Sequence, residues 1–534
     1  MSERIRTRPA REPRQPALLE ADDEVATYLT DASRYPGGSA PRVYLPTSEG
    51  EVAWVLQHEE RVLPVGAQSS LTGGAAPQGD AVLATSRMDH ILSVEAGRAR
   101  VQPGVALVTL QEALRERGAY FPPAPTYEGA FVGGAVSTNA AGAATWKYGT
   151  TREWVEALTV VLANGEVLEV RRGEVSAGPA GFVVETQDGS ELRVPLPSYE
   201  MPDVPKRSAG YHASPGMDLV DLFVGSEGTL GVVTEIELKT LEPAPELLSV
   251  LIPCPSEAVG LQLVARLRAA SQATWQGGDP CGLDVRSVES MDRRAVELVK
   301  EDGSDEAAGL SLPLDTALLL LVMLEMRADF DAAEALSDYD EDAPDSPVKR
   351  LLDLLAELDL LDESELALPS ERARQEQLFA IREAVPTAVN HRVRDAQREI
   401  DGRIHKVGGD MIVPFDRFAE AMAVYRREFV EERGLDLVVW GHISDGNVHP
   451  NVVPTSHHDV EAGHDALLAC GRALAAMGGC PLSEHGTGRN PVKQQLLRQL
   501  YGEEGLAQMR ALKRALDPSG KLARGVVFPW EANP

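Results

Sequence analysis

Two kinds of apolar spacing divide the first half of the chain into short helices and strands. After Thr47 or Ser48, either of which can cap a helix, valine and leucine recur at helical spacing. Two runs of β-branched and aliphatic residues instead flank Asn164-Gly165, which is a strong signal for a β-hairpin over 157–170. By the same criteria we expect strands at 61–66, 81–85, 99–101 and 232–241, and a helix at 107–117.

The pattern changes after Pro243-Ala244-Pro245. Helical stretches such as 256–270 alternate there with strands such as 316–324 and 435–440, and a last helix is expected at 492–516. The arginine- and proline-rich N-terminus has no such periodicity. The expected organisation is a disordered basic tail at 1–23, a first domain at 24–243, a second α+β domain at 244–490, and a helical segment at 491–534 that returns to the first domain.

Length and charge limit the kind of protein this can be. A chain of 534 residues exceeds what one hydrophobic core supports, so we expect at least two domains. The net charge of −31 repels DNA and anionic lipid, which argues against nucleic acid as a partner. The longest apolar run, 317–324, is far shorter than the roughly 20 residues that span a bilayer, so no integral membrane segment is expected.

The cysteines indicate neither a disulfide framework nor an iron–sulfur cluster. Cys254, Cys281, Cys470 and Cys480 lack the close spacings that either would need. The arginines of the N-terminus are not followed by an apolar stretch, as they would be in a secretory signal. We therefore expect free thiols in a cytoplasmic protein.

Three segments of the first domain are dense in glycine and small polar residues: 66–74, 133–142 and 225–231. Glycine lets backbone N–H groups approach an anion closely, and Ser69, Ser70 and Thr72 add hydroxyl donors. No G-x-G-x-x-G opens a helix after a strand, and no G-x-x-x-x-G-K-[ST] is present. A single loop of this kind is more often a plain turn, but three in one domain predict a phosphate-containing cofactor.

A second candidate site surrounds the dipeptide Asp445-Gly446, which favours a two-residue hairpin turn. With these residues at its centre, His442 pairs with His449, and their Cβ atoms lie about 4.5–5.5 Å apart on one sheet face. The two imidazoles can then bind one divalent ion, or they can be hydrogen-bonded core residues. A third ligand is available in Glu484, within the glycine-rich segment 483–488.

These motifs resemble a known family. The segments 64–74, 101–104, 133–139 and 225–231 are similar to the FAD-binding domain of the vanillyl-alcohol oxidase type. The patterns G-H-x-x-D-G-N-x-H and E-H-G-x-G resemble the D-lactate, glycolate and D-2-hydroxyglutarate dehydrogenase branch, and the resemblance covers about 35–529. It implies an α+β fold, with a two-subdomain FAD-binding domain and an α+β cap domain that contains an antiparallel sheet and binds the substrate.

The resemblance also implies the cofactor and the residues around it. FAD is expected to be non-covalent, because neither glycine loop has the histidine or cysteine that covalent members carry. The pyrophosphate of FAD is expected against residues 66–72. The residues expected to contact FAD are Pro64, Gly66, Ala67, Gln68, Ser69, Ser70, Thr72, Gly73, Pro125, Thr126, Gly134, Ser137, Asn139, Gly142 and Val233.

For the reaction, the resemblance implies oxidation of a small D-2-hydroxy acid to the 2-oxo acid. His442, His449 and Glu484 are expected to bind a divalent metal, zinc first and manganese or iron as alternatives. His485 is the implied catalytic base, and Arg382 and Asn447 are implied to hold the substrate. Electrons would pass to a quinone, a cytochrome or an electron-transfer flavoprotein, and the chain could form a homodimer.

Several alternatives stay open. Arg382 can equally be a salt-bridged helix residue. Pro386 and Gly408 stand where relatives have the threonine and lysine for a distal carboxylate, so the side chain of the substrate is not fixed. The protein could also be a flavin oxidase that uses dioxygen, or a non-catalytic electron-relay subunit.

Overall fold

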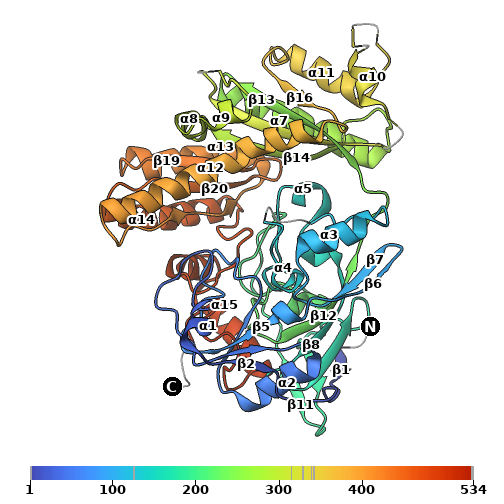
Figure 1. Ribbon diagram of the computed structural model, residues 1–534, viewed down its shortest axis with the longest axis vertical. Coiled ribbons are helices and arrows are strands. Elements are labelled where there is room, and N and C mark those ends of the chain that lie inside the picture. The colour runs from blue at the N-terminus through green and yellow to red at the C-terminus, as the bar shows by residue number, and fades with distance from the viewer. Residues whose placement is uncertain are drawn as a thin grey trace. The chain divides into compact units, whose positions relative to one another are not determined.

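The computed structural model describes residues 3–123, 127–313, 315–327, 330–337, 339–340 and 343–530, in two compact units. Unit 1 comprises Met1–Gly142, Tyr148–Ala244 and Cys480–Pro534, and unit 2 comprises Ala143–Lys147 and Pro245–Gly479. The change of unit after Ala244 lies one residue from the expected boundary. Unit 2, however, ends at Gly479 and not at residue 490, so Glu484 and His485 belong to unit 1. The ribbon in Figure 1 follows the chain through both units.

Three sheets form within the described part of unit 1. The first has the order β2 (Ala17–Leu19), β3 (Val43–Leu45), β5 (Ala81–Ala84), β4 (Val62–Val65), with β5 parallel to both β3 and β4. The second is antiparallel, in the order β6 (Ile91–Glu95), β7 (Arg98–Val101), β12 (Val232–Lys239), β8 (Val155–Val161), β9 (Val167–Arg171). The third contains β1 (Arg4–Arg6), β10 (Phe182–Glu185) and β11 (Glu191–Val194).

The three helices that the sequence predicted in unit 1 are present: one after the cap at residues 47–48, one at 107–117 and one at 492–516. Ser48 accepts a hydrogen bond from the N–H of Glu51 and so caps α2 (Glu49–His58), whose valines and leucines pack on β4, β5 and β8. The other helices are α1 (Asp22–Ala26), α3 (Leu107–Arg115), α4 (Val132–Thr138), α5 (Thr145–Tyr148, at the border of the units), α6 (Val220–Phe223) and α15 (Pro491–Leu516), with short 3₁₀ turns η1 (Thr85–Arg87) and η2 (Thr151–Trp154).

The expectation of a disordered tail at 1–23 is wrong for the described residues of this range. β1 pairs in parallel with β10, where Arg4 stands opposite Val183, and β2 pairs with β3. Arg4 forms an ion pair with Glu191 at 2.6 Å, and Arg8 forms one with Glu49 at 2.5 Å. The segment is ordered by backbone bonds and ion pairs to residues distant in sequence, and such contacts leave no local apolar periodicity to detect.

Unit 2 is built on one antiparallel sheet. The strand order is β16 (Glu365–Ala367), β13 (Glu246–Cys254), β15 (Leu318–Met326), β14 (Val285–Asp292), β19 (Leu437–His442), β20 (Asn447–Val452), β17 (Val407–Gly408), and β18 (Met411–Ile412) also pairs with β20. Its helices are α7 (Glu257–Gly277), α8 (Arg293–Glu301), α9 (Ser304–Ala307), α10 (Ala332–Ser337), α11 (Pro347–Glu357), α12 (Arg372–Glu399), α13 (Phe418–Tyr425) and α14 (His457–Ala476), with a 3₁₀ turn η3 (Phe415–Arg417) and a π-helical turn η4 (Arg426–Glu431).

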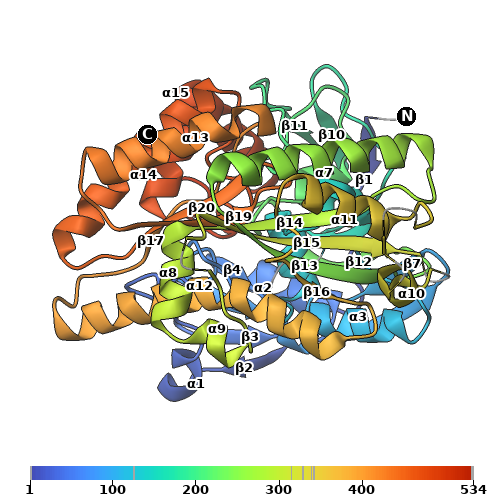
Figure 2. The same ribbon diagram turned by 90° about the horizontal axis from the view of Figure 1, so that it is seen from above.

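Helices cover both faces of this sheet. Figure 2 shows α7 on one side and α8 and α12 on the other. On the second side, Ile381 and Val385 of α12 belong to the same buried core as Met291 of β14 and Trp440 of β19. Glu289, two residues before Met291 on β14, and His442, two residues after Trp440 on β19, lie on this same face. Among the described residues, no helix combines the length and the apolar character needed to cross a bilayer.

Candidate active site

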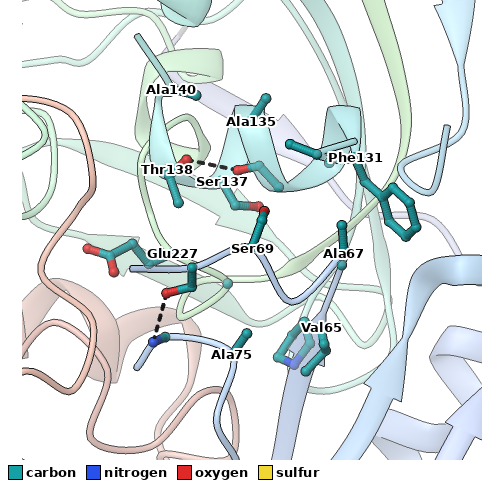
Figure 3. A pocket seen from close by; sticks show the side chains of 18 of the residues that line it. Val65, Ala67, Ser69, Ala75, Phe131, Ala135, Ser137, Thr138, Ala140 and Glu227 are labelled. Atoms are coloured by element: carbon teal, nitrogen blue, oxygen red, sulfur yellow. Dashed lines mark hydrogen bonds between the residues drawn. The ribbon is translucent and has the colours of Figure 1, made fainter. Parts of the chain in front are cut away.

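A cavity of about 300 Å³ lies in unit 1 where the three glycine loops meet. It is lined by the loop that follows β4, by α4 with the residues just before and after it, and by the start of β12 with the loop before it; Figure 3 shows the side chains around it. The expected cofactor residues that line it are Pro64, Gly66, Ala67, Gln68, Ser69, Ser70, Thr72, Gly134, Ser137 and Val233. The structure therefore gathers residues from separate parts of the sequence around one cavity.

Of the remaining expected cofactor residues, the three that the structure describes, Gly73, Asn139 and Gly142, are not among those that line the cavity. Gly73 has φ +75°, and a Cβ there would be 2.6 Å from the ring of Tyr35, so glycine lets the loop pass this ring. Asn139 ends α4 in the left-handed conformation, and its Oδ1 accepts a hydrogen bond from the N–H of Arg152 at 2.9 Å. Gly142 is the last residue of the first segment of unit 1. Pro125 and Thr126 fall outside the described residues.

The first glycine loop suits an anion. Gln68 has φ 55°, a left-handed conformation that occurs in backbone nests for anions. Among the described residues, no hydrogen-bond acceptor is found for the N–H groups of Ala67, Gln68 and Ser69. On the α4 wall, a Cβ at Gly134 would have no atom within 4 Å, which leaves space for a ligand close to the backbone. A pyrophosphate-containing cofactor fits this lining.

Glu227, in the third glycine loop, also lines the cavity, and the sequence analysis missed it. Its two carboxylate oxygens accept hydrogen bonds from the N–H groups of Thr487 and Gly488, each at 2.8 Å. Burial raises the pKa of Glu227 to about 7, although these two hydrogen bonds act in the opposite direction. The sequence feature that could have identified Glu227 is that it is the only charged residue in 225–231.

The segment Ser483–Gly488 places two expected site residues on the wall of the same cavity. Glu484 and His485 both line it, with Nε2 of His485 3.9 Å from Oε2 of Glu484. Oε1 of Glu484 forms an ion pair with Nζ of Lys206 at 2.6 Å, and Lys206 is fully buried. Sequence reasoning missed Lys206, because its partner lies far along the chain.

In unit 2, the hairpin that carries His442 and His449 has a different register from the one expected. Trp440, and not His442, stands opposite His449, and the turn takes four residues, 443–446. Gly441 has φ 148°, a conformation that L side chains rarely adopt, and a Cβ there would lie 2.8 Å from the carbonyl oxygen of Asn447 on the opposite strand. A slip of two residues keeps the same sheet face, so the two histidine rings still adjoin, with centroids 5.5 Å apart and planes at 90°.

A buried carboxylate that the sequence analysis did not single out joins two expected site residues. Glu289 stands opposite His442 in the sheet and accepts a hydrogen bond from its Nδ1. The other oxygen accepts a hydrogen bond from Nε of Arg382 at 2.8 Å. Burial favours a high pKa for Glu289, but the positive charges and hydrogen bonds of His442 and Arg382 outweigh it and hold the pKa well below its usual range.

Asn447 and His449 adjoin a second buried carboxylate, Asp410. Nδ2 of Asn447 donates hydrogen bonds to Oδ1 of Asp410 at 3.3 Å and to the carbonyl of Met411 at 3.0 Å. Nδ1 of His449 lies 3.7 Å from the same Asp410 oxygen. Unit 2 therefore collects Arg382, Asn447, His442 and His449 on one side of its sheet, each beside a carboxylate.

Comparison with known proteins gives matches along most of the chain. Residues 40–171 match the model of the FAD binding domain, and residues 255–527 match the model of the C-terminal domain of FAD linked oxidases. A D-2-hydroxyglutarate dehydrogenase of Xanthomonas citri pv. viticola is 29% identical over 91% of this chain and 89% of its own. The glycolate oxidase subunit GlcD of Bacillus subtilis is 27% identical, over 95% of this chain and 92% of its own.

A D-lactate dehydrogenase of Anaerostipes hadrus is also 27% identical, over 96% of this chain and 94% of its own. Among solved structures, a 4-ethylphenol oxidase from Gulosibacter chungangensis aligns over 96% of this chain and 94% of its own, with a TM-score of 0.62 and 16% identity. At this identity the likeness concerns the fold alone. With the two family models, it confirms the expected fold class, a flavin-binding α+β domain followed by an α+β domain with an antiparallel sheet.

Proposed function

Because the chain belongs to the family of FAD-linked oxidases, we propose that it oxidises a small D-2-hydroxy acid to the 2-oxo acid, with non-covalent FAD. Relatives that align over most of the chain are named for D-2-hydroxyglutarate, D-lactate and glycolate, all of which are 2-hydroxy acids. The observation that carries the proposal is that Glu484 and His485 line the same cavity as the glycine loops. A proton acceptor and a carboxylate thus border the cofactor cavity.

His485 is the proposed catalytic base. A ring nitrogen of His485 takes the proton of the substrate hydroxyl, a role that suits an imidazole near neutral pH. Bound FAD supplies the acceptor for the hydride that leaves the substrate Cα, so the substrate loses one proton and one hydride and becomes a 2-oxo acid. The place of His485 on the cavity wall supports this role.

We further propose that His442, His449 and Glu484 bind a divalent metal, with zinc as the first choice. Within unit 2, the Glu289 carboxylate holds Nδ1 of His442, an arrangement typical of histidines that bind a metal through Nε2. Two histidines and a carboxylate suit zinc, manganese or iron. A bound metal would lower the pKa of a substrate hydroxyl that it coordinates, which makes proton transfer to His485 easier.

Arg382 and Asn447 are the proposed substrate-holding residues. Each already has a buried carboxylate partner, Glu289 for Arg382 and Asp410 for Asn447. Arg382 has five N–H donors; Nε donates to Glu289 and Nη1 to Glu383, each at 2.8 Å, so the donors that are left on Nη1 and Nη2 can bind a substrate carboxylate. The ion pair with Glu289 is thus compatible both with Arg382 as a salt-bridged helix residue and with Arg382 as a substrate-binding residue.

Steady-state assays test the proposed activity. FAD-loaded protein is supplied with D- and L-2-hydroxy acids of different side-chain length, and reduction of an artificial dye is followed. Turnover with at least one D-2-hydroxy acid, and little with its L-enantiomer, is expected. No turnover with any member of the panel would overturn the proposal. Repeating the assay in air without dye tests dioxygen against the proposed acceptors, which are a quinone, a cytochrome or an electron-transfer flavoprotein.

A further inference from the structure

We propose that Glu227 is a positioning residue, which fixes the segment Ser483–Gly488 against the cofactor cavity and so sets the place of His485. The inference rests on the proposed function only for the role of His485. The contacts that support it lie within unit 1 and involve described residues alone. Glu227 lines the cavity, and its carboxylate accepts two hydrogen bonds from the backbone of this segment.

The backbone of Glu227 is the first reason to assign its side chain a role. Glu227 has φ 52°, in the left-handed region that residues with a Cβ adopt at a cost in free energy. Its neighbours Gly225 and Gly228 also have positive φ values, of 82° and 69°. Glycine would occupy position 227 without this strain, so the fold tolerates an unfavourable conformation in order to keep a carboxylate there.

The carboxylate is matched to two backbone donors. Oε1 accepts from the N–H of Thr487 and Oε2 from the N–H of Gly488, each at 2.8 Å. Above the pKa of Glu227, which is about 7, both oxygens belong to an ionised carboxylate, and bonds from a backbone N–H to an ionised carboxylate are stronger than those to a neutral acceptor. Glutamine at this position could satisfy only one of the two N–H groups with its carbonyl oxygen, because its NH₂ group would face the other.

The segment is enclosed between Glu227 and the first glycine loop. A Cβ at Gly486 would lie 2.9 Å from Cδ of Glu227, and a Cβ at Gly488 would lie 2.3 Å from the carbonyl oxygen of Thr72. The same carbonyl accepts hydrogen bonds from Arg489 at 2.9 Å and Asn490 at 3.0 Å. Two of the loops that line the cavity thus hold this segment from both sides, so a ligand that orders those loops also orders the segment.

Hydrogen exchange measured by mass spectrometry tests the proposal on FAD-free and FAD-loaded protein. Measured above the pKa of Glu227, the amides of 486–490 in Glu227→Gln should exchange about tenfold faster than in the unchanged protein, since one bond to a charged acceptor is lost. Glu237→Gln is the matched control. Glu237 is also a buried carboxylate of unit 1, with two hydrogen bonds from Arg171, and it does not line the cavity.

Kinetics supply the second readout. With the metal kept saturating, Glu227→Gln should reduce kcat about tenfold or more, with KM within about threefold, because His485 is misplaced while Arg382 and Asn447, the proposed substrate-holding residues, are unchanged. Glu227→Asp should recover part of the loss, and Glu237→Gln should leave both parameters near those of the unchanged protein.

Unchanged exchange at 486–490 in Glu227→Gln would overturn the inference, as would a rise spread evenly over unit 1, which indicates general destabilisation. These outcomes are separate from the proposed function. If exchange at 486–490 rises in Glu227→Gln but the protein oxidises no 2-hydroxy acid, the proposed function is wrong, whereas the finding that Glu227 positions the segment still holds.

Discussion

Glu289 and His442 are direct cross-strand partners on β14 and β19, and the Glu289 carboxylate accepts a hydrogen bond from Nδ1 of His442. Its second oxygen holds Arg382, so one buried carboxylate orients a proposed metal ligand and a proposed substrate-binding residue. All three side chains are less than a tenth exposed, which makes an unbalanced charge among them costly.

Replacing Glu289 should therefore impair both functions at once. Glu289→Gln keeps the shape but removes the charge that orients His442 and Arg382, and we expect metal affinity and kcat/KM each to fall about 10–100-fold. Metal content per protein chain and steady-state kinetics measure the two effects. Glu325→Gln serves as control, since Glu325 is an ion-paired carboxylate on β15 of the same sheet. Equal losses in both variants would contradict a specific role for Glu289.

Removal of the metal gives a second prediction. Protein treated with a chelator and kept saturated with FAD should lose most of its turnover, because the substrate hydroxyl keeps its high pKa without the metal. Added zinc, manganese or iron should restore activity, and the most effective ion identifies the native metal. His442→Ala and His449→Ala should each lower the bound metal. Full turnover after metal analysis has verified its removal would rule out the metal site.

The hairpin of His442 and His449 shows which features of the candidate site could be predicted from the sequence. The turn signal at Asp445-Gly446 correctly located the turn, and the period-two pattern correctly put both histidines on one sheet face. The register was wrong, because the turn takes four residues, 443–446, and not the two that Asp445-Gly446 favours. A two-residue slip does not change the face, so the prediction that the rings adjoin is confirmed.

The partners of these residues could not be found in the same way. Glu289, Lys206 and Glu227 meet their partners across 153, 278 and about 260 positions of sequence, as set by sheet topology and loop packing. The strands β1 and β2 were missed for the same reason, because their pairing depends on residues elsewhere in unit 1. Local patterns predicted the helices at 107–117, 256–270 and 492–516 and the main strands, since capping and periodicity are local.

The role of His485 can be separated from cofactor binding. His485→Asn should lower kcat by about 10²–10⁴-fold, the usual contribution of a general base, while the protein still binds FAD. Flavin absorbance after gel filtration checks cofactor retention, and single-turnover reduction of the flavin checks the chemical step. A rate of flavin reduction close to that of the unchanged protein would exclude His485 as the base.

The attachment of the flavin is a further prediction. The glycine loops at 66–74 and 133–142 contain neither histidine nor cysteine, so acid precipitation should leave the flavin in the supernatant. Flavin that remained with the precipitated chain would contradict non-covalent binding and would point to an attachment site outside these loops.

The most direct test of the central claim is the absorbance of the oxidised flavin when FAD-loaded protein is mixed with substrate in the absence of oxygen and of any other acceptor. We predict that D-lactate, glycolate or D-2-hydroxyglutarate bleaches the flavin in a single turnover and yields one equivalent of the 2-oxo acid, whereas the L-enantiomers of the chiral acids do not. A flavin that stays oxidised with every 2-hydroxy acid, in protein with its full complement of metal, would contradict the account.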